Sequence, residues 1–124
     1  MNYYGVFFDN DWKQMLLTNY QYLIPAEWIK YADHCTIVHR TNKNWNTITK
    51  YLDNFLGKKV GMEVIGFGIS ENAVALEVDF KTQNEHSHIT LAVKPGHMPV
   101  ESNMITNWYK YPKSRIITGT VERK

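Results

Sequence analysis

The feature that most constrains this sequence is the alternation of side chains with a period of two in two short segments. Along segment 34–39 and along segment 86–93, residues of different character alternate. Successive side chains of a β-strand point to opposite faces of a sheet, so this period predicts a strand in each segment. β-Branched and aromatic runs predict further strands over residues 3–8, 59–69, 73–80 and 116–121.

Helical signals are fewer. Apolar residues recur at helical spacing in segment 44–56, and Gly57 follows where a helix C-cap is common. A second helix is expected over residues 10–20, with Asn10 or Asp11 as its cap. The pattern therefore predicts two helices among many strands.

The order of these elements indicates the fold class. Segment 102–109 predicts one more short helix before the last strand. The helices are interspersed but too few for a doubly wound parallel sheet. We therefore expect an α+β fold with helices packed outside largely antiparallel sheet.

Length and composition limit the function classes. The chain has 124 residues, 44% of them hydrophobic, so we expect a single domain spanning residues 1–124. No apolar run approaches the roughly 18 residues of a membrane span, and segment 1–12 does not resemble a secretory signal. The only cysteine, Cys35, excludes an intramolecular disulfide and indicates a reducing compartment. We expect a cytoplasmic protein without a membrane partner, whose net charge of +2 suits a small anionic ligand.

A repeated motif carries the chemistry. His34-Cys35-Thr36-Ile37 and His88-Ile89-Thr90-Leu91 share the pattern histidine, any residue, threonine, apolar residue. On a strand, the histidine and threonine of each motif point the same way, and the residue between them points into the core. If the two strands lie near each other, two imidazoles and two hydroxyls face one cleft.

Such a cleft suits phosphodiester cleavage without a metal or cofactor. One neutral histidine takes a proton from the attacking oxygen, and the other, as imidazolium, gives a proton to the leaving oxygen. The two hydroxyls hold the non-bridging phosphate oxygens. The alternative is that His34 and His88 are ordinary strand residues and that the threonines are only β-formers.

The stretches around the motifs read HCTIVHR at 34–40, SHITLAV at 87–93 and KPGHMPVESNMITNW at 94–108. With them, the sequence resembles the two-histidine (2H, LigT-like) phosphoesterase superfamily. It is most similar in motif to the cyclic phosphodiesterase domain of fungal-type tRNA ligases and related RNA-repair proteins. That branch has a Pro-Val-x-Ser-Asn segment, matched here at 99–103, and a terminal Ile-x-Gly-x-Val, matched at 117–121.

The resemblance implies a fold and an activity. The fold would be bilobed, with two mainly antiparallel sheets facing a central cleft. His34, Thr36, His88 and Thr90 would be the catalytic quartet, with no metal and no cofactor. The expected substrate is a 2′,3′-cyclic phosphate at an RNA 3′ end or on a nucleotide.

Two other functions stay open. Viral members of the superfamily degrade cyclic oligonucleotide immune signals, so an anti-CBASS phage nuclease acting in the host cytoplasm is one alternative. A non-catalytic RNA- or nucleotide-binding module is the other, although a binder has no need for both histidines.

Several residues are candidates for substrate binding. Either Tyr3 or Tyr4 must face away from the core and could stack on a nucleobase, as could Trp108. The segment match adds Ser102 and Asn103, and Glu122 could contact a base edge or ribose.

The remaining histidines and the cysteine have other interpretations. His39 lies at odd spacing from His34 and is expected on the opposite face, in a structural or surface role. His86 could line the edge of the cleft. A metal site built from His34, His86, His88 and Asp33 is possible but would leave the threonines idle. Cys35 is expected to pack in the core.

Overall fold

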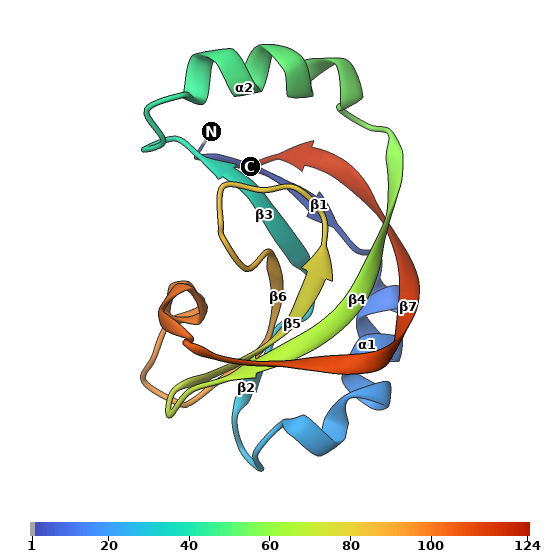
Figure 1. Ribbon diagram of the computed structural model, residues 1–124, viewed down its shortest axis with the longest axis vertical. Coiled ribbons are helices and arrows are strands. Elements are labelled where there is room, and N and C mark those ends of the chain that lie inside the picture. Colours follow the sequence, from blue (N-terminus) through green and yellow to red (C-terminus); the bar gives the residue numbers. More distant parts are fainter. Residues whose placement is uncertain (1) are drawn as a thin grey trace.

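The computed structural model describes residues 2–124, in which two α-helices accompany one seven-stranded sheet (Figure 1). With η denoting a 3₁₀-helix, the elements in chain order are β1 (Tyr3–Phe7), α1 (Asn10–Asn19), η1 (Gln21–Leu23), β2 (Ile29–Lys30), β3 (His34–His39), α2 (Trp45–Leu52), η2 (Asp53–Phe55), β4 (Lys59–Ile69), β5 (Ala73–Asp79), β6 (His88–Val93), η3 (Pro99–Met104) and β7 (Asn107–Arg123).

Six of the strands close into an antiparallel barrel. The sheet order is β2-β6-β3-β1-β7-β4-β5, and β5 also pairs with β6, which closes the ring and leaves β2 as an extra strand on β6. The mixed α+β class is confirmed. The two mainly antiparallel sheets that we expected are joined into one continuous closed sheet, because β5 pairs with β4 along one edge and with β6 along the other.

The core fills the inside of this barrel. Val6, Cys35 and Ile89 are fully buried and belong to one hydrophobic cluster, together with residues of β4, β5 and β7. Helix α2 lies across one end of the barrel (Figure 1), and its last residue, Leu52, is buried. The side chains that alternate with the core residues along β3 and β6 therefore point outward.

The strands β4 and β7 are long and strongly curved (Figure 1). Their register shifts between Val64 and Gly66, which marks a bulge in the ladder. At this place the two backbones approach so closely that a Cβ on Gly66 would lie 2.2 Å from the carbonyl oxygen of Tyr109. Glycine is therefore required at the bend.

Most predicted elements are present, with two corrections. The N-cap of α1 is Asp9, whose carboxylate accepts a hydrogen bond from the Trp12 backbone N–H at 2.9 Å; it is neither Asn10 nor Asp11. The helix expected over residues 102–109 was wrong. The 3₁₀-helix η3 starts earlier, at Pro99, and β7 already begins at Asn107 because this segment pairs with the end of β4.

Among the described residues, no helix combines the length and the apolar character that crossing a membrane requires.

Candidate active site

The two histidine–threonine motifs lie side by side on neighbouring strands. β3 and β6 pair antiparallel, with the middle residues of the motifs, Cys35 and Ile89, opposite each other. This register sets the histidine of each motif beside the threonine of the other. The four polar side chains thus form an approximately twofold arrangement on the outer face of the barrel.

All four side chains line a single cavity of about 500 Å³, which we name the central cavity. They are half-buried, whereas the residue between the histidine and threonine of each motif is fully buried in the core. The central cavity is lined by His34, Thr36, His88 and Thr90 and by Tyr3, His39, Thr41, Gln83, Asn84, Pro99, Val100 and Asn103.

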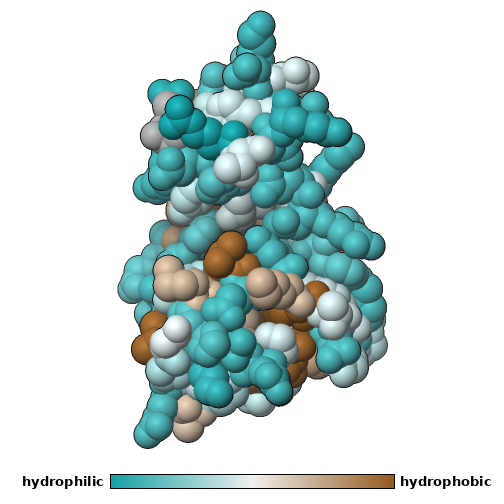
Figure 2. Space-filling view, turned by 90° about the vertical axis from the view of Figure 1, so that its left-hand side faces the viewer, coloured by the Kyte–Doolittle hydropathy of each residue, from teal (hydrophilic) through white to brown (hydrophobic). Residues whose placement is uncertain are grey.

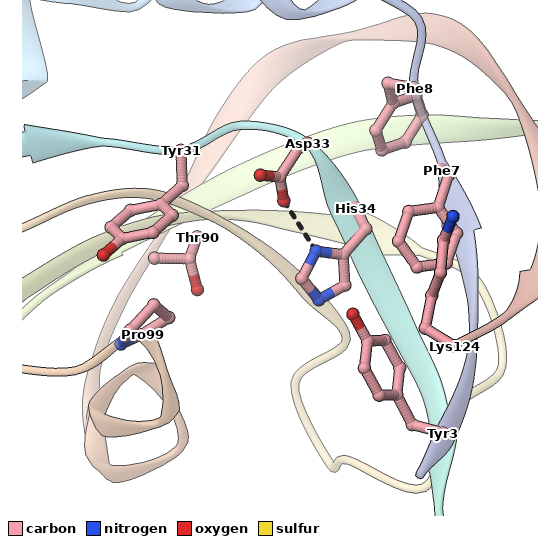
Figure 3. A pocket seen from close by; sticks show the side chains of 9 residues that line it. All are labelled: Tyr3, Phe7, Phe8, Tyr31, Asp33, His34, Thr90, Pro99 and Lys124. Carbon is pink, nitrogen blue, oxygen red and sulfur yellow. Dashed lines mark hydrogen bonds and ion pairs between the residues drawn. The ribbon is translucent and has the colours of Figure 1, made fainter. Parts of the chain in front are cut away.

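The imidazole of His34 is held from three sides. Its Nδ1 lies 2.6 Å from Asp33 Oδ1, and this hydrogen bond is the main cause that holds the pKa of Asp33 below its usual value. Its ring stacks on Phe7 with centroids 5.1 Å apart and an interplanar angle of 18°, and the ring of Tyr3 lies 5.3 Å away. The other ring nitrogen points into the open space toward Tyr3 and Thr90 (Figure 3).

The environment of His88 is different. Its Nδ1 donates a hydrogen bond to the backbone carbonyl of His86 at 2.8 Å. Burial is the main cause that lowers the pKa of His88; the hydrogen bond to the His86 carbonyl acts to raise it, and the nearby His34 and His86 charges act to lower it further. A carbonyl can only accept, so Nδ1 carries the proton and Nε2 of the neutral ring is left with a lone pair.

One of the two threonine hydroxyls has a buried partner. Thr90 Oγ1 and Ser102 Oγ are 2.8 Å apart, and Ser102, a residue of η3, is only 1% exposed. Ser102 was predicted to bind substrate. It contacts Thr90, which faces the central cavity, and it also lines a pocket next to that cavity.

The two candidate tyrosines point to opposite sides of β1. Tyr3 lines the central cavity, and burial and the charge of Asp33 raise its phenol pKa. Tyr4 points the other way: it is 3% exposed, donates its hydroxyl hydrogen bond to Asp53 and packs edge-on against Trp45. Tyr4 is therefore a core residue and cannot stack on a ligand.

Of the remaining predicted binding residues, two lie at the site and one does not. Asn103 lines the central cavity, and Trp108 lines a pocket next to it. Glu122 lies outside both spaces; its carboxylate is 3.3 Å from Lys124 Nζ, and its backbone pairs with Gly5. The structure does not bring Glu122 to the site.

Two side pockets adjoin the central cavity. The aromatic pocket (Figure 3) shares Tyr3, His34, Thr90 and Pro99 with it and adds Phe7, Phe8, Tyr31, Asp33 and Lys124. The tryptophan pocket shares Asn84, His88 and Asn103 with it and adds Glu85, His86, Ser102, Met104, Ile105, Thr106 and Trp108.

His39 is a site residue whose placement we predicted wrongly. It lines the central cavity on the same face as His34. The register between β1 and β3 shifts, with Tyr4 opposite Val38 but Gly5 opposite Thr36, so Ile37 is an extra residue in the ladder. Such a bulge reverses the alternation beyond it, and spacing alone does not reveal it.

The residues of the alternative metal site do not gather into a ligand cluster. Within residues 2–124, no three histidine, cysteine, aspartate or glutamate side chains are grouped as metal ligands. Cys35 is fully buried, and burial raises its thiol pKa to about 12, so it is not a nucleophile.

Neither the family models nor the curated proteins that were compared with this chain match it.

Proposed function

We propose that this chain is a two-histidine (2H) phosphoesterase that cleaves a ribonucleotide phosphodiester without a metal. The observation that carries this proposal is the pairing of the two motifs across β3 and β6, with both histidines and both threonines lining one cavity. If the motifs were ordinary strand segments, nothing would require the same pair of functional groups to line one cavity twice. We also propose that the closed sheet is a version of the bilobed 2H fold.

The surroundings of the two imidazoles support different roles. Burial lowers the pKa of His88 and so favours its neutral ring, although the hydrogen bond to the His86 carbonyl acts in the opposite direction; His88 is therefore the general base. His34 is then the general acid, because Asp33 holds its ring through Nδ1 and leaves the other ring nitrogen facing the open space. The burial of His88 is the difference that supports this division of roles.

With these roles, the reaction is a single displacement at phosphorus. Nε2 of His88 takes the proton of the attacking hydroxyl or water as its oxygen bonds to phosphorus. The bond from phosphorus to the leaving oxygen breaks, and Nε2 of His34 donates a proton to that oxygen. The hydroxyls of Thr36 and Thr90 donate to the non-bridging oxygens, and Ser102 is placed to orient Thr90.

Two substrate forms fit this chemistry. In a 2′,3′-cyclic phosphate, at an RNA end or on a nucleotide, the attacking group is water. In a linkage between two nucleosides, as in a cyclic oligonucleotide immune signal, the neighbouring 2′-hydroxyl can attack instead. Pockets on both sides of the central cavity favour the second form.

The test is turnover of chelator-treated protein on a panel of 2′,3′-cyclic mononucleotides, cyclic-phosphate RNA and cyclic oligonucleotides. We expect turnover of at least one, and a loss of about 10²- to 10⁴-fold in His34→Ala and in His88→Ala, the usual contribution of a proton-transfer group. His97→Ala is the control, because His97 is paired with Glu101 and does not line the central cavity.

Three results would contradict the proposal. They are near-normal turnover in either alanine variant, a chelator-sensitive activity restored by added metal, and binding of the panel without any turnover. The last result would support the non-catalytic binding module.

A further inference from the structure

We propose that the tryptophan pocket is a nucleobase subsite, so that the phosphodiester in the central cavity joins two nucleosides. This inference rests on the proposed function and specifies its substrate class. The phosphorus of a 2′,3′-cyclic phosphate is bonded to a single nucleoside, and at an RNA end the preceding nucleosides continue from the 5′ side of that nucleoside and not from the phosphorus. A subsite beyond His88 is needed only when another nucleoside continues on that side of the phosphorus.

The position of the pocket supports this assignment. It opens directly from the central cavity, with which it shares Asn84, His88 and Asn103, and its volume is about 340 Å³. On the opposite side, the aromatic pocket shares His34 and Thr90 with the central cavity. A phosphate held by the quartet therefore has a pocket on each side, as a linkage between two nucleosides requires.

The walls of the pocket have the chemistry of a base-binding site. The rings of His86 and Trp108 stack on each other, with an interplanar angle of 12° and centroids 4.9 Å apart, which leaves the outer face of the 38% exposed His86 side chain for a base to stack on. The side-chain amides of Asn84 and Asn103 supply donors and acceptors for the edge of a base. Glu85 adds a carboxylate, which opposes a second phosphate in the pocket.

Apolar side chains lie in and near the pocket. Met98, Val100 and Met104, in and next to η3, are exposed large hydrophobic residues; Met104 lines the tryptophan pocket and Val100 lines the central cavity. Figure 2 shows apolar side chains gathered in the lower half of the face on which η3 lies, whereas the upper half is hydrophilic. The flexible side chain of Met104 can adapt to the face of the bound base that does not stack on His86.

The orientation of His86 is supported from inside the protein. Its Nδ1 lies 2.9 Å from a carboxylate oxygen of Glu77, whose side chain is 7% exposed, while that of His86 is 38% exposed. Lys110 Nζ donates to the other oxygen of Glu77 at 2.7 Å. Burying a carboxylate is costly, and here its two side-chain partners are surface residues. The arrangement holds the imidazole parallel to the indole before a ligand arrives.

The proposal is tested by binding rather than by turnover. In a His34→Ala background, which retains the whole tryptophan pocket, we would titrate the dinucleoside monophosphate ApA and adenosine 3′-monophosphate by calorimetry. We expect ApA to bind more tightly. Adding His86→Ala should weaken ApA by about 5- to 150-fold, the loss that corresponds to removing about 1–3 kcal/mol of base stacking, and should change the mononucleotide far less.

His97→Ala is the matched control. Like His86, His97 is half-exposed and has a carboxylate partner at Nδ1, Glu101 at 3.0 Å, but it does not line the tryptophan pocket. It should leave both affinities unchanged. Thermal unfolding of each variant checks the fold; if His86→Ala is unfolded, His86→Phe keeps a flat ring in the pocket and should retain most of the ApA affinity.

The possible failures are distinguishable. Equal affinities for ApA and the mononucleotide, equal losses for both in His86→Ala, or the same ApA loss in His97→Ala would overturn the subsite while leaving the proposed activity intact. If the unsubstituted protein neither binds these probes nor turns over any member of the substrate panel, the proposed function itself fails.

Discussion

At the scale of single residues, the two candidate catalytic histidines differ in burial and in the partner of Nδ1. Burial lowers the pKa of His88, whose Nδ1 donates to a carbonyl, whereas Nδ1 of His34 faces the carboxylate of Asp33. In the proposed reaction Asp33 is a positioning residue, because it acts on the substrate only through the ring of His34. Activity and thermal unfolding, measured together, separate this role from a purely structural one.

The rate of the unsubstituted protein should depend on pH as a bell, because only the singly protonated histidine pair is active. Since burial lowers the pKa of His88, the acid limb of kcat/KM should lie below the ordinary titration range of histidine. In Asp33→Asn, kcat/KM should fall at least about tenfold, because the ring of His34 loses the carboxylate that orients it, while the acid limb should stay in place.

The measurement is kcat/KM from about pH 4 to pH 9 for both proteins. The acid limb is the internal control, because Asp33 does not contact His88, whose hydrogen bond goes to His86. If kcat/KM does not change, or falls only together with the thermal unfolding temperature, Asp33 is not the positioning residue of His34.

At the scale of elements, β4 and β7 can bend around the barrel because their backbones touch at Gly66. A methyl group there would lie 2.2 Å from the Tyr109 carbonyl oxygen, a contact that only backbone movement can relieve. This bend also positions the first residues of β7, and therefore Trp108, next to β5 and η3.

We expect Gly66→Ala to lower the free energy of unfolding by about 1–3 kcal/mol, as overpacking does in other proteins. Gly61→Ala on the same strand is the control, since its nearest neighbour would lie 3.7 Å away in ordinary van der Waals contact. Denaturant unfolding of both variants measures the difference, and equal stabilities would mean that the bend yields without cost.

At the scale of the whole molecule, stability should depend on pH through the carboxylates. For Glu77, burial acts to raise the pKa, but hydrogen bonds and charges from Lys110 and His86 outweigh it, so the pKa lies below the usual value. The pKa of Asp33 is also lowered, chiefly by its hydrogen bond to His34. A group with a lower pKa in the folded state stabilises the protein above its unfolded pKa and loses that contribution as the pH falls through the folded pKa.

The free energy of unfolding should therefore decrease as the pH falls from about 5 to about 3. Glu77→Gln should be less stable than the unsubstituted protein at neutral pH, and its stability should fall less steeply over this interval. Denaturant unfolding at several pH values measures both slopes; parallel slopes would mean that Glu77 does not contribute to the acid sensitivity.

The local structure and the chemical groups of the site could be predicted from the sequence. The period of two predicted strand β3 with its observed bounds, and it put the histidine and threonine of each motif on one face. Local backbone geometry sets these features. Trp108 and Asn103 were also predicted as binding candidates, and the structure brings both next to the motifs.

Which of these groups lie close together depends on strand pairing between residues distant in sequence. This pairing sets the closure of the sheet between β5 and β6 and the bulge that turns His39 into the central cavity. It also sets the burial of Tyr4 and Ser102 and the partners of the two histidines. Glu77 and His86 are separated by nine residues and meet only because a loop returns the chain from β5 to β6. Side-chain periodicity records the direction of each residue along its own strand, but it contains no information about the register of the neighbouring strand.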